Sequence, residues 1–300
     1  MMQSVHQQLI ATIAYADVFD YPLTDEETRR WMISLTTSKI ATRIPGIDRI
    51  REGSKTYHLL HGRKDILSLR ANRHRIAQDK WRFVRSVTRS LQWIPTVELI
   101  GVTGGLSVDN AKSEDDIDLF FIAHRGTLWM TRLLVTIASE IMGIRRRPGD
   151  HAVADKICLN MFMAEDALGL APGDRDLFSA HEVLQMVPIW EREGSYRRFL
   201  QANEWVKWFL PNAWRDNVKH RESRVRRSSV SVFFLMLLGL CEPLARELQL
   251  RYMRRRRTAE VITPGVLRFH PKDARVWIKK KYRARLRRYN IPLDNVFYHR

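Results

Sequence analysis

Two aspartates and a pair of glycines are the residues of this sequence whose types and spacing could do chemistry. Asp116 and Asp118 flank the first residue of the apolar run Ile117–Ala123, and Gly104 and Gly105 follow the earlier apolar run Val97–Val102. We expect each run to form a strand. Side chains alternate across a β-strand, so we expect the two carboxylates on the same face. Neighbouring carboxylates repel each other unless a cation lies between them, and oxygen ligands of this kind suit Mg²⁺ or Mn²⁺.

The glycine pair adds a second kind of binding group. A turn built from glycine brings backbone N–H groups close to a ligand, because no Cβ lies in the way. Together with the acids, the turn predicts a site for phosphate groups and a divalent metal. The alternative is a tight turn followed by an acidic loop that happens to precede a strand.

The pattern resembles the signature of the nucleotidyltransferase superfamily to which polymerase beta belongs. That signature is an apolar residue, Gly, Gly or Ser, about ten residues, then Asp, an apolar residue, and Asp or Glu. Here it reads Thr103-Gly104-Gly105, a spacer, and Asp116-Ile117-Asp118, and the resemblance covers residues 95–165. It implies an α+β fold around a small mixed sheet. It also implies transfer of a nucleoside monophosphate from a nucleoside triphosphate to an acceptor hydroxyl.

The resemblance also assigns roles to residues. Asp116 and Asp118 would bind one or two Mg²⁺ or Mn²⁺ ions and act in catalysis. The backbone of Gly104 and Gly105, with the Ser107 hydroxyl, would hold the β- and γ-phosphates. Further positive charge would come from Lys112, or from the adjacent Arg145, Arg146 and Arg147. The alternative for these three arginines is a solvated helix end.

The third strand of the predicted core departs from the family pattern, in which it usually carries a third carboxylate. Residues 156–163 form an apolar run whose alternation places Cys158 and Asn160 on one face, with no acid among them. Asp155 precedes the strand, one position out of phase. Either Asp155 reaches the site, or Asn160 supplies an amide oxygen beside two carboxylates, or the site binds a nucleotide without efficient turnover.

The charge of the chain is concentrated in its last third. Residues 213–300 hold twenty-three lysines and arginines against seven acids, whereas the rest of the chain is close to neutral. Such a field favours a polyanion, and we expect RNA bound through its backbone, or a basic face that aids solubility. Residues 272–289 predict a basic amphipathic helix. The candidate nucleic-acid contacts are Arg254, Arg255, Lys279, Lys280, Arg283 and Arg287.

Residues 1–62 resemble a winged-helix domain in the order of their elements. We expect one helix over residues 4–19, a second that begins at a capping box formed by Thr24 and Glu27, and a third near Ser38–Ile44. A hairpin with strands over 47–50 and 56–60 is expected to follow. Such a domain binds DNA or serves as a packing module. Residues 63–92 then predict a connecting helix that leads into the nucleotidyltransferase core at 93–170.

Residues 171–300 are expected to form a helical, basic region. One helix is predicted over Tyr196–Leu210. The apolar run Val230–Cys241 is interpreted as a buried core helix, and the less favoured alternative is a helix lying at a membrane surface beside arginines. It is too short to span a bilayer, which takes about 20 residues. A membrane is therefore not expected among the partners.

The remaining features of the sequence limit the class of protein to which the chain can belong. Cys158 and Cys241 are far apart and form no metal-binding pattern, and no signal peptide is predicted at the start, so we expect a cytoplasmic protein. The leading hypothesis is a nucleotidyltransferase acting on an RNA end. The alternatives are nucleotidylation of a small molecule or a protein, and a nucleic-acid-binding regulator with little catalysis. The sequence does not predict the oligomeric state.

Overall fold

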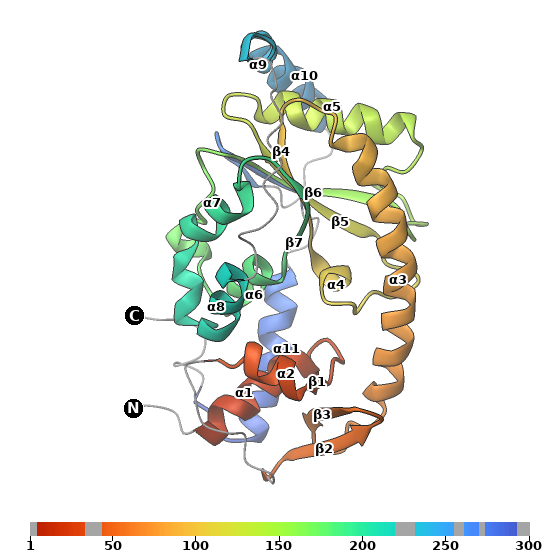
Figure 1. The fold of residues 1–300 in the computed structure, drawn as a ribbon, viewed down its shortest axis with the longest axis vertical. Coiled ribbons are helices and arrows are strands. Elements are labelled where there is room, and N and C mark those ends of the chain that lie inside the picture. Colours follow the sequence, from red (N-terminus) through yellow and green to blue (C-terminus); the bar gives the residue numbers. More distant parts are fainter. Residues whose placement is uncertain (1–4, 34–43, 220–231, 255–260, 270–273, 293–300) are drawn as a thin grey trace.

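The computed structural model describes residues 5–33, 44–219, 232–254, 261–269 and 274–292, and the chain is mixed α and β, with two sheets (Figure 1). The larger sheet has six strands in the order β7-β4-β5-β6-β9-β8. Strands β5 and β6 are parallel and the other neighbours are antiparallel, so the sheet is mixed. Its strands are β4 (Val97–Val102), β5 (Ile117–Ala123), β6 (Ile157–Ala164), β7 (Val187–Glu191), β8 (Val261–Ile262) and β9 (Val266–Arg268).

The two apolar runs beside the candidate site form β4 and β5 with the predicted bounds. Nearly all their side chains are buried, because the sheet is covered on both faces. Alternate residues of β5 enter different cores: Phe120 and Ile122 lie on one face, Leu119 and Phe121 on the other. The carboxylates at the start of β5 are therefore fixed by a strand that is anchored on two sides.

Helices cover both faces of this sheet. One face packs against α5 (Leu128–Ile141) and α10 (Glu242–Arg254), and the other against α6 (Leu177–Gln185) and α7 (Ser195–Ala202). The long helix α3 (Ile66–Leu91) runs along one side of the molecule, from the small sheet up to β4 (Figure 1). It is the connecting helix that the sequence predicts.

The small sheet lies in the amino-terminal part of the chain and has the order β1-β3-β2. The capping box is confirmed, since Thr24 Oγ1 accepts a hydrogen bond from Glu27 N and the Glu27 carboxylate accepts one from Thr24 N. The hairpin is also confirmed, with strands that reach closer to the turn at Gly53 than expected. Positions 38–43 of the third expected helix lie outside the described residues, so the winged-helix assignment stays a prediction. The elements here are α1 (Val5–Asp17), β1 (Leu23–Thr24), α2 (Asp25–Arg30), β2 (Ile47–Glu52) and β3 (Lys55–Leu60).

The carboxy-terminal region is less purely helical than predicted, because it supplies β7, β8 and β9 to the large sheet. The single helix expected over Tyr196–Leu210 is also divided. Helix α7 ends at Ala202, and the Asn203 side chain donates hydrogen bonds to Leu168 O and Phe199 O, which ends the regular helix. The other helices of this region are η1 (Pro172–Asp174), which precedes it, and η2 (Glu204–Trp208) and α8 (Pro211–Lys219), which follow it.

The predicted amphipathic helix is confirmed as α11 (Ala274–Arg288). Its apolar stripe, with Ile278, Tyr282 and Leu286, is buried against α1, and Tyr282 Oη donates a hydrogen bond to Ala11 O at 3.0 Å. Because α11 packs on the amino-terminal helix, the two ends of the described chain close over the same side of the large sheet (Figure 1).

The interpretation of Val230–Cys241 as a buried core helix is wrong for the residues that the structure describes. They form α9 (Val232–Leu240), and Phe233 and Leu240 are 76% and 78% exposed. Composition shows that this segment is apolar, but not which surface it meets. No helix in the described part of the chain is long and apolar enough to cross a membrane.

Candidate nucleotide and metal site

The glycine turn lies directly against the second aspartate. After β4 the chain passes through Thr103 into a four-residue helix, α4 (Gly104–Ser107), and Gly104 has a φ of +68°. A Cβ added to Gly104 would lie 2.6 Å from Asp118 Oδ2. The backbone N–H of Thr103 donates to Asp118 O at 3.0 Å, which ties the turn to β5. Only glycine therefore fits here, for both conformational and steric reasons.

Asp116 and Asp118 lie side by side where β5 begins, as the alternation predicts. Cys158 of β6 is the register partner of Asp118. One oxygen of each carboxylate and the Cys158 sulfur all lie within 4.8 Å of one another. Ile117 between the two acids is fully buried and holds this part of the strand in the core.

The charge state of this group follows from its surroundings. Burial, and then the neighbouring Asp116 charge, raise the pKa of Asp118 to about 7, against the effects of the Cys158 thiol and the Arg146 guanidinium. Burial and the two acids raise the pKa of Cys158, so its thiol stays protonated and hydrogen-bonds to Asp118. Arg146 forms an ion pair with Asp116.

The donor set fits a hard divalent cation. The two carboxylates supply oxygen ligands, whereas a protonated thiol is a poor ligand for any metal. A further oxygen is available, because Asn160 Oδ1 is buried and has no hydrogen-bond partner. A buried polar atom without a partner is costly, so it points to a ligand that would satisfy it. Asp116 and Asp118 could thus hold Mg²⁺ or Mn²⁺, with Asn160 facing the same space.

These groups open into one cavity of about 870 Å³. This is within the size range of small-molecule sites. One part of its wall is the turn and the strand ends, with Gly104, Gly105, Ser107, Asp116, Asp118, Arg146 and Asn160. The opposite part comes from the turn after α1, from α6 and from α11, with Phe19, Phe178, Ser179, Glu182 and Trp277.

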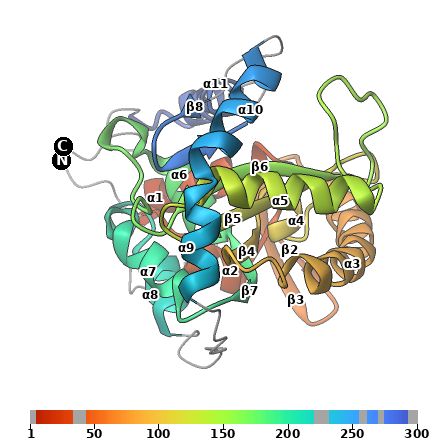
Figure 2. The same cartoon turned by 90° about the horizontal axis from the view of Figure 1, so that it is seen from above.

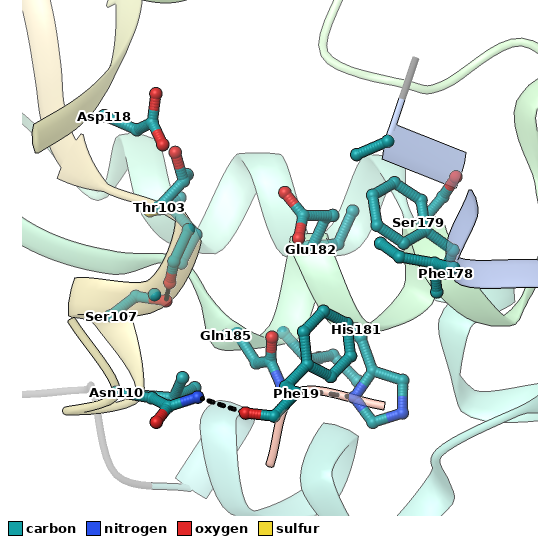
Figure 3. Close-up of a pocket in the computed structure, with 18 of the residues that line it drawn as sticks. Phe19, Thr103, Ser107, Asn110, Asp118, Phe178, Ser179, His181, Glu182 and Gln185 are labelled. Carbon is teal, nitrogen blue, oxygen red and sulfur yellow. Dashed lines mark hydrogen bonds between the residues drawn. The ribbon is translucent and has the colours of Figure 1, made fainter. Parts of the chain in front are cut away.

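Glu182 is the acid that sequence reasoning did not find. Its carboxylate lies between Asp118 and Thr103 on one side and Phe178 and Ser179 on the other (Figure 3). No described residue forms a hydrogen bond or close ion pair with it, and burial raises its pKa to about 7, with Arg275 acting in the opposite direction. Nothing in the sequence around Glu182 marks it, since it is a single acid on a mostly apolar helix.

The neighbouring His181 is a structural residue. Its ring stacks on Tyr15 at 4.0 Å, and burial lowers its pKa to about 3, so it stays neutral. Asn110, in the spacer between the glycines and the acids, donates a hydrogen bond to Phe19 O at 3.0 Å and lines the cavity (Figure 3). This contact joins the loop before β5 to the amino-terminal part of the chain.

Replacing Glu182 with glutamine is expected to stabilise the protein above neutral pH. The folded pKa near 7 exceeds the ordinary value of 4.5, so the folded state retains a proton that the unfolded state loses between these pH values. Stability of the wild type therefore falls as pH rises through this window, and the glutamine variant avoids the loss. We expect a gain of about 2 kcal/mol at pH above 7 and little gain below pH 4.5.

Urea unfolding at both pH values, without metal, measures this difference, with the exposed Glu52→Gln as control. A gain of equal size at both pH values would show that packing, not charge, is the cause.

Four of the predicted residues do not line the cavity. Asp155 has a φ of +58° and its carboxylate accepts a hydrogen bond from the buried Lys80 Nζ at 2.6 Å. Lys112 is exposed, and its backbone N–H and carbonyl form hydrogen bonds with Asp115. Arg145 pairs with Glu140 at 2.6 Å, as Arg147 does at 2.7 Å. Of the basic run, only Arg146 lines the cavity.

The candidate nucleic-acid residues do not form one surface. Lys280, Arg283 and Arg287 are exposed on α11, whereas Lys279 pairs with Asp176 at 2.8 Å. Arg254 ends α10, at the opposite end of the molecule from α11 (Figure 1). Arg255 lies outside the described residues.

A second group of acids with a histidine lies at the other end of the same strands. His124 Nδ1 is 3.3 Å from Glu98 Oε1 and 3.2 Å from Glu165 Oε1. Glu165 also accepts a hydrogen bond from Arg125 N and pairs with Arg198 at 3.5 Å. Because its members are paired with one another and with an arginine, we interpret this group as structural.

Comparison of the chain with protein-family models, with curated proteins and with solved structures gave no match.

Proposed function

We propose that this protein is a metal-dependent nucleotidyltransferase that moves a nucleoside monophosphate from a nucleoside triphosphate to an acceptor hydroxyl. The observation that carries the proposal is the contact between the glycine turn and the acids. Gly104 lies so close to Asp118 that an added Cβ would collide with its carboxylate, and Asp116 is beside it in the same cavity. A backbone turn for phosphate and a carboxylate pair for a cation thus share one space.

In this reaction the acceptor oxygen attacks the α-phosphorus, the bond from that phosphorus to the bridging oxygen breaks, and pyrophosphate leaves. A bound Mg²⁺ or Mn²⁺ would neutralise negative charge that develops on the phosphoryl oxygens. Asp116 and Asp118 would hold the cation, and the backbone at Gly104 and Gly105 would lie against the phosphates. Arg146 would add positive charge on the same side of the cavity.

The proton of the acceptor hydroxyl also needs a destination, and the third strand offers no carboxylate for it. Glu182 is suited to accept this proton. It faces the same cavity and no described residue pairs with its carboxylate. Its pKa near 7 places it where a general base works best at neutral pH.

Two classes of acceptor are supported by different observations. Lys280, Arg283 and Arg287, exposed on α11, support a nucleic-acid end, most plausibly RNA. The cavity itself supports a small molecule, because Glu182 and the aromatic rings of Phe178 and Trp277 line the part that lies away from the glycine turn. The Glu182 carboxylate would repel a polyanionic acceptor. We therefore favour a small molecule as the acceptor that binds in the part of the cavity lined by Glu182, Phe178 and Trp277.

The test is transfer from each labelled triphosphate, in the presence of Mg²⁺ or Mn²⁺, to total RNA or to a mixture of small hydroxyl compounds. Pyrophosphate release and a labelled product are expected. Glu182→Gln should lower transfer to either acceptor by about a hundredfold, as expected for loss of a general base. The triple variant Lys280→Gln, Arg283→Gln, Arg287→Gln should lower transfer to RNA only.

Several outcomes would separate the alternatives. Equal transfer to RNA by the triple variant and the wild type would exclude α11 as the acceptor surface. Salt-sensitive binding of RNA, with no metal-dependent transfer from any triphosphate, would overturn the proposal and favour a nucleic-acid-binding regulator.

A further inference from the structure

Helix α9 is apolar on every side. Its nine residues carry no charged or polar side chain, and none of those whose surroundings are described is buried. A helix of this kind is normally enclosed by protein or lipid. Its sequence therefore requires a covering that the described residues do not provide.

The exposed apolar surface continues onto the next helix. Leu244, Leu248 and Tyr252 of α10 follow one another at four-residue steps, and each is more than half exposed. We call the exposed apolar residues of the two helices the apolar ridge: Phe233, Phe234, Met236, Leu237 and Leu240 of α9 with Leu244, Leu248 and Tyr252 of α10.

The apolar ridge is held in place by the packing of α10 on α5. The opposite side of α10 packs on α5, where Glu242 accepts hydrogen bonds from Trp129 N and Met130 N at 2.7 and 2.8 Å. Gln249 donates to Trp129 O at 2.8 Å. Seen from above, α10 crosses α5 and α9 extends beyond it (Figure 2). The inner side of α10 also buries Ala245 and Met253. Leu244, Leu248 and Tyr252 lie on its outer side.

The charges around the apolar ridge are basic. From Leu244 to the end of α10 at Arg254 there are three arginines and one glutamate. Arg251 and Arg254 are 70% and 67% exposed, and both lie beside Glu247, at 2.8 and 3.9 Å from its Oε1, so one acid faces two arginines. Arg246 is also exposed. Two copies meeting through this surface would bring like charges together, whereas anionic lipid headgroups would neutralise them.

The size of α9 excludes a spanning arrangement. At 1.5 Å per residue it is about 14 Å long, against a hydrocarbon core of about 30 Å. A short apolar segment beside arginines is instead typical of insertion into one leaflet at the level of the headgroups.

We propose that α9 and α10 form a docking site for the surface of an anionic phospholipid membrane. The apolar ridge enters the outer part of one leaflet, and Arg246, Arg251 and Arg254 contact lipid phosphates. The site lies at the end of the molecule opposite α1 and α11 (Figure 1), and it does not depend on the proposed transfer reaction.

Flotation of the full chain with vesicles tests this site. One set of vesicles is phosphatidylcholine alone and the other contains about one-third phosphatidylserine. The wild type is expected to float with the anionic vesicles. The double variant Phe233→Glu, Leu240→Glu should reduce this binding at least about tenfold, since each buried side chain contributes well over a kilocalorie. Arg251→Gln with Arg254→Gln should reduce binding to the anionic vesicles only.

The matched control is Val276→Glu, which changes an apolar residue that is 70% exposed on α11. It should bind vesicles as the wild type does. Because all these positions are exposed, circular dichroism and thermal unfolding should be unchanged. Failure of the wild type to float, or equal flotation by the double variant, would overturn the proposal. Self-association through the ridge without vesicle binding would also overturn it. Nucleotidyl transfer is measured in parallel on the same proteins. Its outcome is independent of vesicle binding, so failure of one proposal is distinguished from failure of the other.

Discussion

Asp118→Asn and Asp116→Asn are each expected to lower metal-dependent nucleotidyl transfer by at least about a thousandfold, because charge neutralisation by a bound cation is worth several kilocalories. Both substitutions keep the side-chain shape and remove the charge that would hold the cation. Folding should be intact. Asp118→Asn should even raise the unfolding free energy above neutral pH, since burial raises the pKa of Asp118 to about 7 and its ionised form is disfavoured.

Initial rates of labelled-product formation with Mg²⁺ and with Mn²⁺ measure this effect. The control is Glu114→Gln, an exposed acid two positions before Asp116 that does not line the cavity. It should transfer at the wild-type rate. Undiminished transfer by both aspartate variants would remove the proposed role of this pair.

Gly104→Ala is expected to lower transfer by at least about a hundredfold and the unfolding free energy by about 1–2 kcal/mol. The φ of +68° is unfavourable for alanine, and the new Cβ would lie 2.6 Å from Asp118 Oδ2. The carboxylate or the turn must move, and either movement disturbs the space between them.

The variant Gly126→Ala separates the effect of backbone strain from the effect of a collision with the Asp118 carboxylate. Gly126 has a φ of +70°, and a Cβ there would meet nothing within 4 Å. Both variants should lose stability in chemical unfolding, but only Gly104→Ala should lose transfer. If Gly104→Ala keeps wild-type activity, the close approach of turn and acid is not needed for the reaction.

Local patterns in the sequence predicted the parts of the structure that depend on nearby residues. The apolar runs gave β4 and β5 their bounds, and the alternation put Asp116 and Asp118 on one side. The capping box at Thr24 and the four-residue spacing of Ile278, Tyr282 and Leu286 also depend on short-range geometry. Each of these features depends on residues of a single strand or helix.

Features that depend on distant residues were not predicted. Asp155 lies two positions before the strand that runs beside the acids, yet Lys80, seventy-five positions earlier, binds its carboxylate. Glu182 enters the cavity because α6 crosses the open side of the turn, which no spacing in the sequence shows. Strands β7 and β9 join the large sheet through long-range pairing. Composition identified α9 as apolar, but its surroundings are set by how α10 packs on α5.

The most direct test of the central claim is calorimetric binding of the four α,β-methylene nucleoside triphosphates, which cannot be cleaved at the reacting bond. We expect at least one of them to bind the wild type in the presence of Mg²⁺ or Mn²⁺ and to bind much more weakly without the metal. Asp118→Asn and Gly104→Ala should lose this metal-dependent binding, whereas Glu114→Gln and Gly126→Ala should keep it. Binding that needs no metal, or that survives both Asp118→Asn and Gly104→Ala, would contradict the account.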